Sequence, residues 1–489
     1  MGPPAKKAQI SQEAFDSVVQ ENVEEFGMEM DEALADAITT FTLQGVDLSG
    51  IITDGGGGAS LDKHPVIMAI HNLQTAVAAV VGEKLTSTDV TELYQNFRVG
   101  ETNLTPELEA DIVSTLDTLR ISCSEEGPSN ISIAERNGGV EVLLATCKTL
   151  RTCKSPSLEH ALAALCACLT DDSSREKFKL YHGPQIVFES LSMENVSDKI
   201  LENGAAVVAA ASTKDEDVKD MFVHLKVHEV LIDQLKKHQT YPGVVQGVCD
   251  ALRSLVTADD ERIAVSRAFQ NGMLIAKTGA MDTLLEVALQ QIKSTSVLPS
   301  LCIALKNLAV NDEICKSVAD KGGLELVMKF LTTSREQNHK IMARSACILL
   351  IQLSGSDTNK NAVVQQLGGL PEIVDLISHF SQEASVVQEA LTAVAVLTLR
   401  SPVNASEAVK SGVVDVTAEM MEKHTGSPGL QRQACQLIRN LAVRNLENRP
   451  IILEKGLEKL IRQAKANHVI CRDAASAALR DLGFDDYNM

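Results

Sequence analysis

A glycine followed by an apolar pattern such as Leu324-x-Leu326-Val327 recurs along most of the chain at intervals of 43 to 46 residues. A pattern of small residues, leucines and one polar residue follows each copy. A repeat of this period is typical of stacked architectures, because one short unit cannot bury its own apolar faces. The anchor glycines are Gly139, Gly183, Gly279, Gly323, Gly369, Gly412 and Gly456.

One copy lacks its glycine. Between Gly183 and Gly279 there is room for two units, and the missing anchor falls at Val227, where the segment 228–232 keeps the apolar register. That unit gains about eight residues before the next anchor. The sequence therefore predicts eight copies.

Each unit is predicted to contain three helices. The first is short, as in 312–320, which Asn311 caps; Asn404 and Glu407 form a capping-box pattern for another. The anchor glycine then ends this helix in a left-handed conformation. The second helix carries one apolar stripe. The third, as in 434–441, is apolar on much of its circumference and must be sandwiched between neighbouring units.

Composition agrees with an all-α fold. Hydrophobic residues make up 45% of the chain, but aromatic residues only 3%, and tryptophan is absent. Large β-sandwiches rely on aromatic and β-branched residues, whereas this chain is rich in helix formers.

The formal charge of −20 argues against general nucleic-acid binding, which needs a basic surface. The eleven cysteines show no zinc-like spacing, no apolar run is long enough to span a bilayer, and the N-terminus lacks a signal-peptide core. These features predict a soluble, reduced, intracellular protein located in the cytoplasm, with the nucleus left open. We expect no membrane or nucleic-acid partner, no small-molecule substrate, no cofactor and no metal.

The N-terminal part differs from the repeats. A helical N-terminal segment is predicted over 1–52. Residues 8–30 alternate apolar and acidic residues at helical spacing, and Asp31 is the expected cap of a second helix that ends near Gly45. A Gly-rich linker is predicted over 53–64, and a divergent helical capping region over 65–126, with Thr105 as the cap of a helix that begins at Pro106. The repeats occupy 127–489. The N-terminal hairpin either packs on the chain itself or binds a partner.

A short helix, a glycine hinge and two longer helices at this period resemble the armadillo repeat. The paired glycines at 138/139, 322/323 and 368/369 favour it over the HEAT repeat. The chain is more specifically similar to the armadillo repeat-containing protein 6 family, through Ser11–Phe15, Gln44–Ser49, Gln433–Leu441 and Ala478–Gly483. This resemblance implies a right-handed α-solenoid whose third helices line a concave groove, and an activity limited to protein interaction.

One polar position recurs just before the last leucine of the third helix. It holds Ser254, Asn307, Gln352, Thr398, Asn440 and Asp481. The resemblance implies that Asn307 and Asn440 bind the main chain of an extended peptide, and a carboxamide offers both the donor and the acceptor that this needs. The simpler interpretation is that a polar residue at an exposed position needs no ligand.

Basic residues accompany this position. They are Arg253, Lys306, Arg439 and Arg480 immediately before it, with Arg344 and Arg432 about two turns upstream. A basic stripe in an acidic chain can attract an acidic segment, although it can equally balance nearby carboxylates. Importin-type armadillo proteins grip basic signals with tryptophan beside the asparagine, so that function is not expected in this chain.

The remaining candidates are structural. Cys249, Cys302, Cys347 and Cys435 all lie five residues before the polar position, where close helix packing requires a small side chain. For Cys166 and Cys168 a redox role stays open. His224 and His228 share a helix face, but no third metal ligand is evident.

The sequence therefore predicts a non-enzymatic scaffold or adaptor that binds an extended or helical partner segment, with acidic and apolar residues, in the groove. The candidate groove residues are Arg253, Lys306, Asn307, Arg344, Arg432, Arg439, Asn440 and Arg480. The alternatives are an adaptor that binds through its N-terminal hairpin or outer surface, and a regulatory subunit of an enzyme.

Overall fold

The computed structural model describes residues 8–10, 12–24, 26–48, 51, 64–81, 104–125 and 128–486. Most of the predicted Gly-rich linker, residues 53–63, lies outside the described residues. The chain forms two compact units. Unit 1 comprises residues 1–231 and 259–264, and unit 2 comprises residues 232–258 and 265–489.

A small helical hairpin forms the N-terminal part of unit 1. Its elements are β1 (Ala8–Gln9), α1 (Gln12–Glu24), α2 (Met30–Leu43) and β2 (Val46–Asp47), and the two short strands pair in parallel. Phe15 and Phe41 pack with ring centroids 5.8 Å apart inside a core that also contains Val19 and Ala37. The prediction that Asp31 caps α2 is wrong, because this helix begins at Met30 and the residue before it is Glu29.

Two longer helices follow, α3 (Pro65–Val81) and α5 (Pro106–Glu125), and they pack against each other. Thr105 caps α5 as expected, since its Oγ1 accepts a hydrogen bond from the Leu108 amide at 3.3 Å. α5 in turn packs against the third helix of the first repeat, α8.

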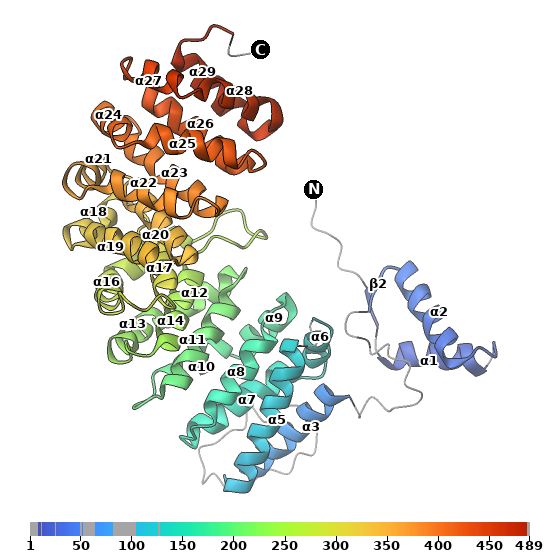
Figure 1. Cartoon of the computed structure of the whole chain (residues 1–489). Coiled ribbons are helices and arrows are strands. Elements are labelled where there is room, and N and C mark those ends of the chain that lie inside the picture. Colours follow the sequence, from blue (N-terminus) through green and yellow to red (C-terminus); the bar gives the residue numbers. More distant parts are fainter. Residues whose placement is uncertain are drawn as a thin grey trace. The chain divides into compact units, whose positions relative to one another are not determined.

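Eight helical triplets occupy the rest of the described chain (Figure 1). The first three are α6 (Pro128–Arg136), α7 (Gly139–Thr152), α8 (Leu158–Cys168); α9 (Asp172–Leu180), α10 (Gly183–Leu191), α11 (Asp198–Ser212); and α12 (Glu216–His224), α13 (Val227–Lys237), α14 (Pro242–Leu255). The next three are α15 (Ala268–Lys277), α16 (Ala280–Gln290), α17 (Leu298–Leu308); α18 (Asp312–Asp320), α19 (Gly323–Glu336), α20 (Lys340–Leu353); and α21 (Asp357–Asn361) continued by the π-helical η2 (Ala362–Gln366), α22 (Gly369–His379), α23 (Ala384–Thr398). The last two are α24 (Pro402–Lys410), α25 (Val413–Lys423), α26 (Pro428–Ala442); and α27 (Asn448–Glu454), α28 (Leu457–Asn467), and η3 (Val469–Cys471) leading into α29 (Arg472–Leu482).

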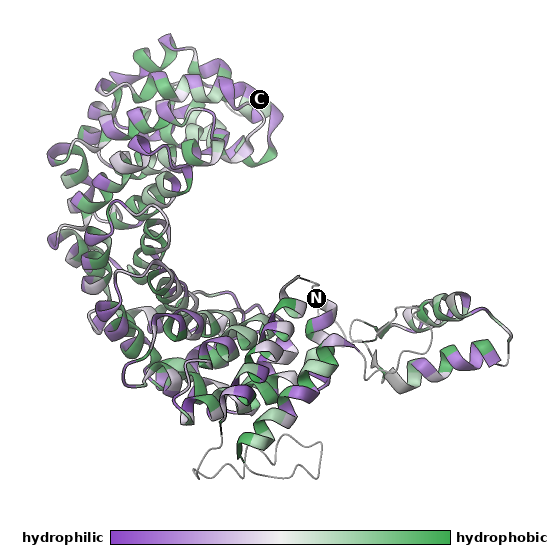
Figure 2. Cartoon of the chain, turned by 60° about the horizontal axis from the view of Figure 1, so that its bottom comes forward, coloured by the Kyte–Doolittle hydropathy of each residue, from purple (hydrophilic) through white to green (hydrophobic). Residues whose placement is uncertain are grey.

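The third helices form the core of each unit. In unit 1, α5, α8 and α11 pack in series, and in unit 2 the series is α14, α17, α20, α23, α26 and α29. Most of their apolar residues are buried. Figure 2 shows hydrophobic and hydrophilic stretches of these helices in different colours. The predicted all-α fold with eight repeats is therefore confirmed, apart from the two-residue strand pair in the hairpin.

The predicted left-handed residue of the hinge is correct in some repeats and displaced by one residue in others. Gly279, Gly412 and Gly456 have positive φ as predicted, but Gly139, Gly323 and Gly369 do not; the positive φ belongs to the residue before each of them. Gly323 begins α19 and is required for a different reason, because a Cβ there would lie 2.7 Å from the Val318 carbonyl oxygen.

The hinge conformation persists where glycine is missing. His182 has φ 57° and Lys226 has φ 61° at the corresponding positions. Packing between the helices therefore imposes the left-handed conformation even on residues that adopt it only at a cost.

A buried asparagine in the first helix recurs in five repeats, and the sequence reasoning missed it. Each Nδ2 donates to a carbonyl at the end of a third helix or of α5, where the helix has no partner of its own. The pairs are Asn130 with Ser122, Asn271 with Leu255, Asn359 with Leu353, Asn404 with Leu397 and Asn448 with Leu441.

The same arrangement corrects the predicted capping box of α24. The cap is Ser401, whose Oγ accepts from the Asn404 amide at 3.4 Å, and Asn404 itself is fully buried. The cap predicted for α18 is confirmed, since Asn311 Oδ1 accepts from the Ile314 amide at 2.9 Å.

Candidate partner-binding surface

Unit 2 carries all eight candidate groove residues on its third helices, and we call this set the third-helix row. It consists of Arg253 on α14, Lys306 and Asn307 on α17, Arg344 on α20, Arg432, Arg439 and Asn440 on α26, and Arg480 on α29. The side chains of Arg344, Arg439 and Arg480 are 51%, 48% and 50% exposed. About half of each of these side chains is therefore accessible to a ligand.

Several arginines of the row already have carboxylate partners. Arg439 Nε lies 3.2 Å from Asp481 Oδ2, and Arg480 Nε lies 2.9 Å from Asp481 Oδ1, so two guanidinium groups share one carboxylate that is itself 9% exposed. This carboxylate cancels part of the positive charge that the sequence led us to expect.

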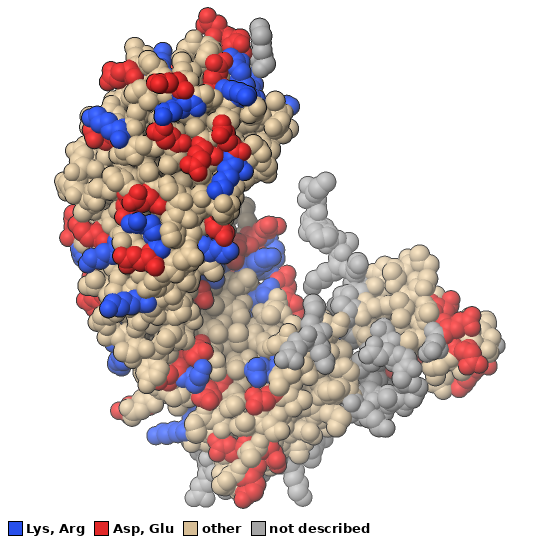
Figure 3. All heavy atoms as spheres, viewed as in Figure 1, with Lys and Arg blue, Asp and Glu red and all other residues tan. Residues whose placement is uncertain are grey.

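Two further pairs follow the same pattern. Arg344 contacts Glu389 of the neighbouring third helix at 3.3 Å, and Arg253 contacts Asp250 on its own helix at 3.5 Å. Over the visible face of unit 2, Lys and Arg are interspersed with Asp and Glu (Figure 3). The third-helix row therefore combines half-exposed guanidinium groups on α20, α26 and α29 with carboxylates that partly neutralise them.

Two carboxamide side chains at the polar position donate hydrogen bonds to backbone carbonyls of the same chain. Asn440 Nδ2 donates to the Ala395 carbonyl in the last turn of α23 at 2.8 Å, and Gln352 Nε2 donates to the Ala309 carbonyl just after α17 at 2.6 Å. Both donate to carbonyls at a helix end, where the intrahelical amide donor is missing. Asn307 differs, because its Oδ1 accepts from the neighbouring Lys306 Nζ at 3.1 Å. One N–H of the Asn440 carboxamide is therefore used within its own chain.

The alignment of the polar position was wrong in one repeat. α23 and α26 have the same length, 15 residues, and place Val396 rather than Thr398 at the position of Asn440. Thr398 is 1% exposed, and its Oγ1 donates to the Val394 carbonyl at 2.8 Å. Hence α23 contributes no polar side chain to the third-helix row.

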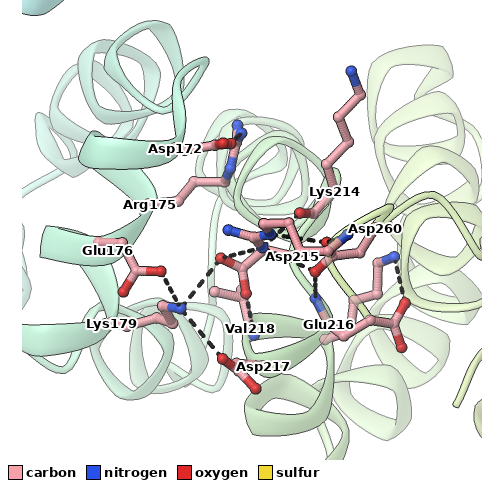
Figure 4. Close-up of polar contacts among 12 residues, drawn as sticks. Asp172, Arg175, Glu176, Lys179, Lys214, Asp215, Glu216, Asp217, Val218 and Asp260 are labelled. Atoms are coloured by element: carbon pink, nitrogen blue, oxygen red, sulfur yellow. Dashed lines mark hydrogen bonds and ion pairs between the residues drawn. The ribbon is translucent and has the colours of Figure 1, made fainter. Parts of the chain in front are cut away.

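A second charged cluster lies in unit 1 (Figure 4). Residues 259–264 of the long α14–α15 connection, which contains the additional residues of the glycine-less repeat, lie against the N-terminus of α12. The Asp260 carboxylate accepts a hydrogen bond from the Glu216 amide at 3.2 Å and another from Arg262 Nε at 2.8 Å. The Arg262 guanidinium also donates to the Lys214 carbonyl at 2.8 Å. Its hydrogen bonds to the Asp260 carboxylate hold the pKa of that carboxyl well below the usual range.

Buried charges complete this cluster. Lys219 is fully buried, and its Nζ contacts Glu216 Oε1 at 2.9 Å and the Asp259 carboxylate. Asp215, 1% exposed, caps α12 through the Val218 amide at 3.0 Å and lies 3.3 Å from Lys179 Nζ. Such pairing is what buried charges require. These ion pairs and hydrogen bonds hold the α14–α15 connection against α12, and we assign the cluster a structural role.

The other sequence candidates are placed as follows. Cys249, Cys302, Cys347 and Cys435 are at most 1% exposed, which confirms them as core residues. His228 is 1% exposed, and the His224 ring contacts the Asp220 carbonyl. Among the described residues there is no group of three or more His, Cys, Asp or Glu suited to bind a metal. Within the same residues no helix is long and apolar enough to cross a membrane.

Comparison with known proteins decides the family. A family model described as ARMC6 matches residues 99–486, and one described as the armadillo repeat-containing protein 6 N-terminal domain matches residues 7–64. The chain belongs to the armadillo repeat-containing protein 6 family. Family relatives include the protein of that name from Homo sapiens, 28% identical over 408 residues, which are 81% of this chain and 75% of the relative. The homologue from Drosophila melanogaster is 26% identical over 396 residues, covering 80% and 77%.

Solved structures share the fold. An engineered protein aligns with a TM-score of 0.64 at 19% identity, over 97% of this chain and 100% of its own. A structure from work on a phosphorylation switch that controls the interaction between cadherin and beta-catenin aligns with a TM-score of 0.57 at 17% identity, over 86% and 78%. At these identities the likeness concerns the fold alone, which supports the armadillo solenoid of this family.

Proposed function

We propose that the chain is a protein-interaction scaffold whose third-helix row binds an extended or helical segment of a partner that carries acidic and apolar residues. The observation that carries this proposal is the set of half-exposed guanidinium groups on α20, α26 and α29, three third helices of one packed series. An extended segment that crosses successive repeats meets such a donor at several of them.

The proposed binding energy comes from many small contributions. Exposed ion pairs contribute about 0.2–1 kcal/mol each, and a partner carboxylate has to share Arg439 and Arg480 with Asp481. Four basic residues together then contribute at most about 0.8–4 kcal/mol, which corresponds to roughly a 4- to 900-fold change in affinity. Apolar contacts have to supply the rest, so the interaction should weaken with salt without disappearing.

The test is capture of partners from extract by the intact chain and by a variant in which Arg253, Lys306, Arg439 and Arg480 are changed to Gln. Glutamine removes the charge but keeps donors, so Asp481 is not placed beside a new carboxylate. The matched control changes four exposed lysines on first and second helices or just after them, Lys321, Lys410, Lys423 and Lys455, to Gln. We expect specific partners to be lost by the row variant and retained by the control. Equal capture by both variants, with unchanged circular dichroism, would reject the row as the binding surface.

A second candidate function is binding through the N-terminal hairpin. The hairpin has its own core, yet Phe26 at the turn between α1 and α2 and Leu43 at the end of α2 are 66% and 83% exposed. Residues 8–62 contain no Lys, Arg or His, so a partner for this surface would have basic and apolar residues. Deletion of residues 1–52 would remove that partner and leave the acidic partner of the third-helix row bound.

A further inference from the structure

Two cysteine thiols meet where α5 packs against the third helix of the first repeat. Cys123 lies in the last turn of α5, and Cys168 is the last residue of α8. Their Sγ atoms are 3.7 Å apart, which is van der Waals contact between sulfur atoms, and the residues are 2% and 1% exposed. Of the cysteines considered from the sequence, only Cys166 and Cys168 were left open for redox chemistry, and the partner from α5 could not be seen there.

We propose that Cys123 and Cys168 form a reversible oxidation site, in which a hydroperoxide converts the dithiol to a disulfide that joins α5 to the first repeat. Other buried cysteines of the described third helices, such as Cys302 and Cys347, serve as small packing residues in the core. The proposal rests on contact between two thiols from different helices, and their separation of 45 positions makes the resulting cross-link a non-local one.

The two thiols have different roles in the reaction. Cys168 donates its S–H to Cys123, and this hydrogen bond lowers the pKa of the Cys123 thiol, whereas the pKa of Cys168 is raised. Cys123 is therefore the nucleophile, because the thiolate is the reactive form. Its sulfur attacks a peroxide oxygen, the O–O bond breaks, and hydroxide leaves and takes up a proton to form water, which gives a sulfenic acid. The Cys168 sulfur then attacks that sulfur, the S–O bond breaks, and a second water leaves with the Cys168 proton.

Access to the buried pair comes from the end of α5. Cys123 lies two residues before Glu125, where the helix ends, and the neighbouring Ser124 is exposed. Terminal turns open more readily than helix centres, and hydrogen peroxide is close to water in size. The disulfide removes conformational freedom from the unfolded chain between the two residues. Oxidation should therefore raise the melting temperature of unit 1.

The test is treatment of the full chain with one equivalent of hydrogen peroxide, followed by alkylation in denaturant and mass spectrometry. We expect nine of the eleven cysteines to be alkylated, a mass loss of two hydrogens, a peptide that links Cys123 to Cys168, and full reversal by dithiothreitol. Cys123→Ser should keep all its remaining thiols, and Cys168→Ser should stop at a sulfenic acid on Cys123 without a cross-link. Cys153→Ser, at a partly exposed control site, should still lose two thiols to the disulfide.

Three results would overturn the proposal. They are eleven alkylated thiols in the treated wild-type chain, a disulfide that maps to any other pair, and addition of oxygen to Cys123 without a cross-link. Because the linkage is mapped on the wild-type chain, the conclusion does not depend on the folding of a variant.

Discussion

The adjacent hinge glycines Gly322 and Gly323 should respond very differently to the same substitution. Gly322 has φ +83°, and a Cβ there would meet only Glu325 Oε2, at 3.9 Å. Asparagine adopts this left-handed conformation more readily than other side-chain-bearing residues, so Gly322→Asn should cost less than about 1 kcal/mol. At Gly323 a Cβ would lie 2.7 Å from the Val318 carbonyl oxygen, which belongs to the backbone and cannot rotate away. Gly323→Asn should cost about 2–3 kcal/mol, as overpacked sites do.

The assay is urea unfolding followed by circular dichroism, together with hydrogen exchange of the α18 and α19 amides, which localises the effect within unit 2. Gly323→Asn should lower the midpoint and the protection of these helices, and Gly322→Asn should change both only slightly. Equal losses for the two variants, or a larger loss at Gly322, would show that the assignment of separate roles to the two glycines is wrong.

Three further predictions concern polar contacts. Lys219→Met should destabilise unit 1 by about 3–5 kcal/mol, because Glu216 is left buried without its ammonium partner; a neutral effect in thermal unfolding would contradict this. Asp260→Asn should destabilise the chain at pH 6 and progressively less as the pH falls toward 2. Folding lowers the pKa of the Asp260 carboxyl, so this carboxyl stabilises the fold above its unfolded pKa near 4 and loses that contribution as the pH falls through the folded pKa. A difference in stability between wild type and variant that does not narrow on acidification would refute the ion pair. Asn440→Ala should cost about 0.5 kcal/mol, because the Ala395 carbonyl loses its donor at 2.8 Å and keeps only the longer hydrogen bond from Thr398 Oγ1 at 3.3 Å. Chemical denaturation that shows no loss would argue against this contribution.

The repeat architecture could be predicted because it depends on periodicity. The spacing of the glycines and the apolar third helices determines a stacked α-fold whatever the exact register, so eight repeats were predicted although the hinge position was displaced by one residue. The displacement arose because two glycines stand side by side at 322 and 323, and the sequence does not say which has positive φ and which lacks room for a Cβ.

The charge pattern of the third-helix row could be predicted only in part. The row was found from its spacing, but Asp481 was read as one more polar position rather than as the carboxylate shared by Arg439 and Arg480. In the same way, the sequence did not show that Asn440 Nδ2 donates to a carbonyl of a neighbouring helix, and the expected contact of Asn440 with a ligand stays a prediction. The contacts of Arg439 with Asp481 and of Asn440 with Ala395 join residues more than 40 positions apart, and no local pattern specifies them.

The α14–α15 connection illustrates the same limit. The sequence showed that this repeat has about eight additional residues, but not what they contact. In the structure Asp259 pairs with the buried Lys219 of α12, and Asp260 accepts a hydrogen bond from the Glu216 amide at the N-terminus of that helix. Arg262 donates to the Lys214 carbonyl just before α12. A recurring asparagine such as Asn359, Asn404 and Asn448, at steps of 45 and 44 residues, was visible in the sequence and could have been recognised.

The most direct test of the proposed scaffold is hydrogen exchange of the chain with and without a captured partner, with backbone amides resolved by helix. We predict that binding slows exchange at the third helices of unit 2 that carry the row, α14, α17, α20, α26 and α29, while the second helices α16, α19, α22, α25 and α28 stay unchanged. Protection confined to α1 and α2, or to the second helices, would contradict the claim that the third-helix row is the binding surface.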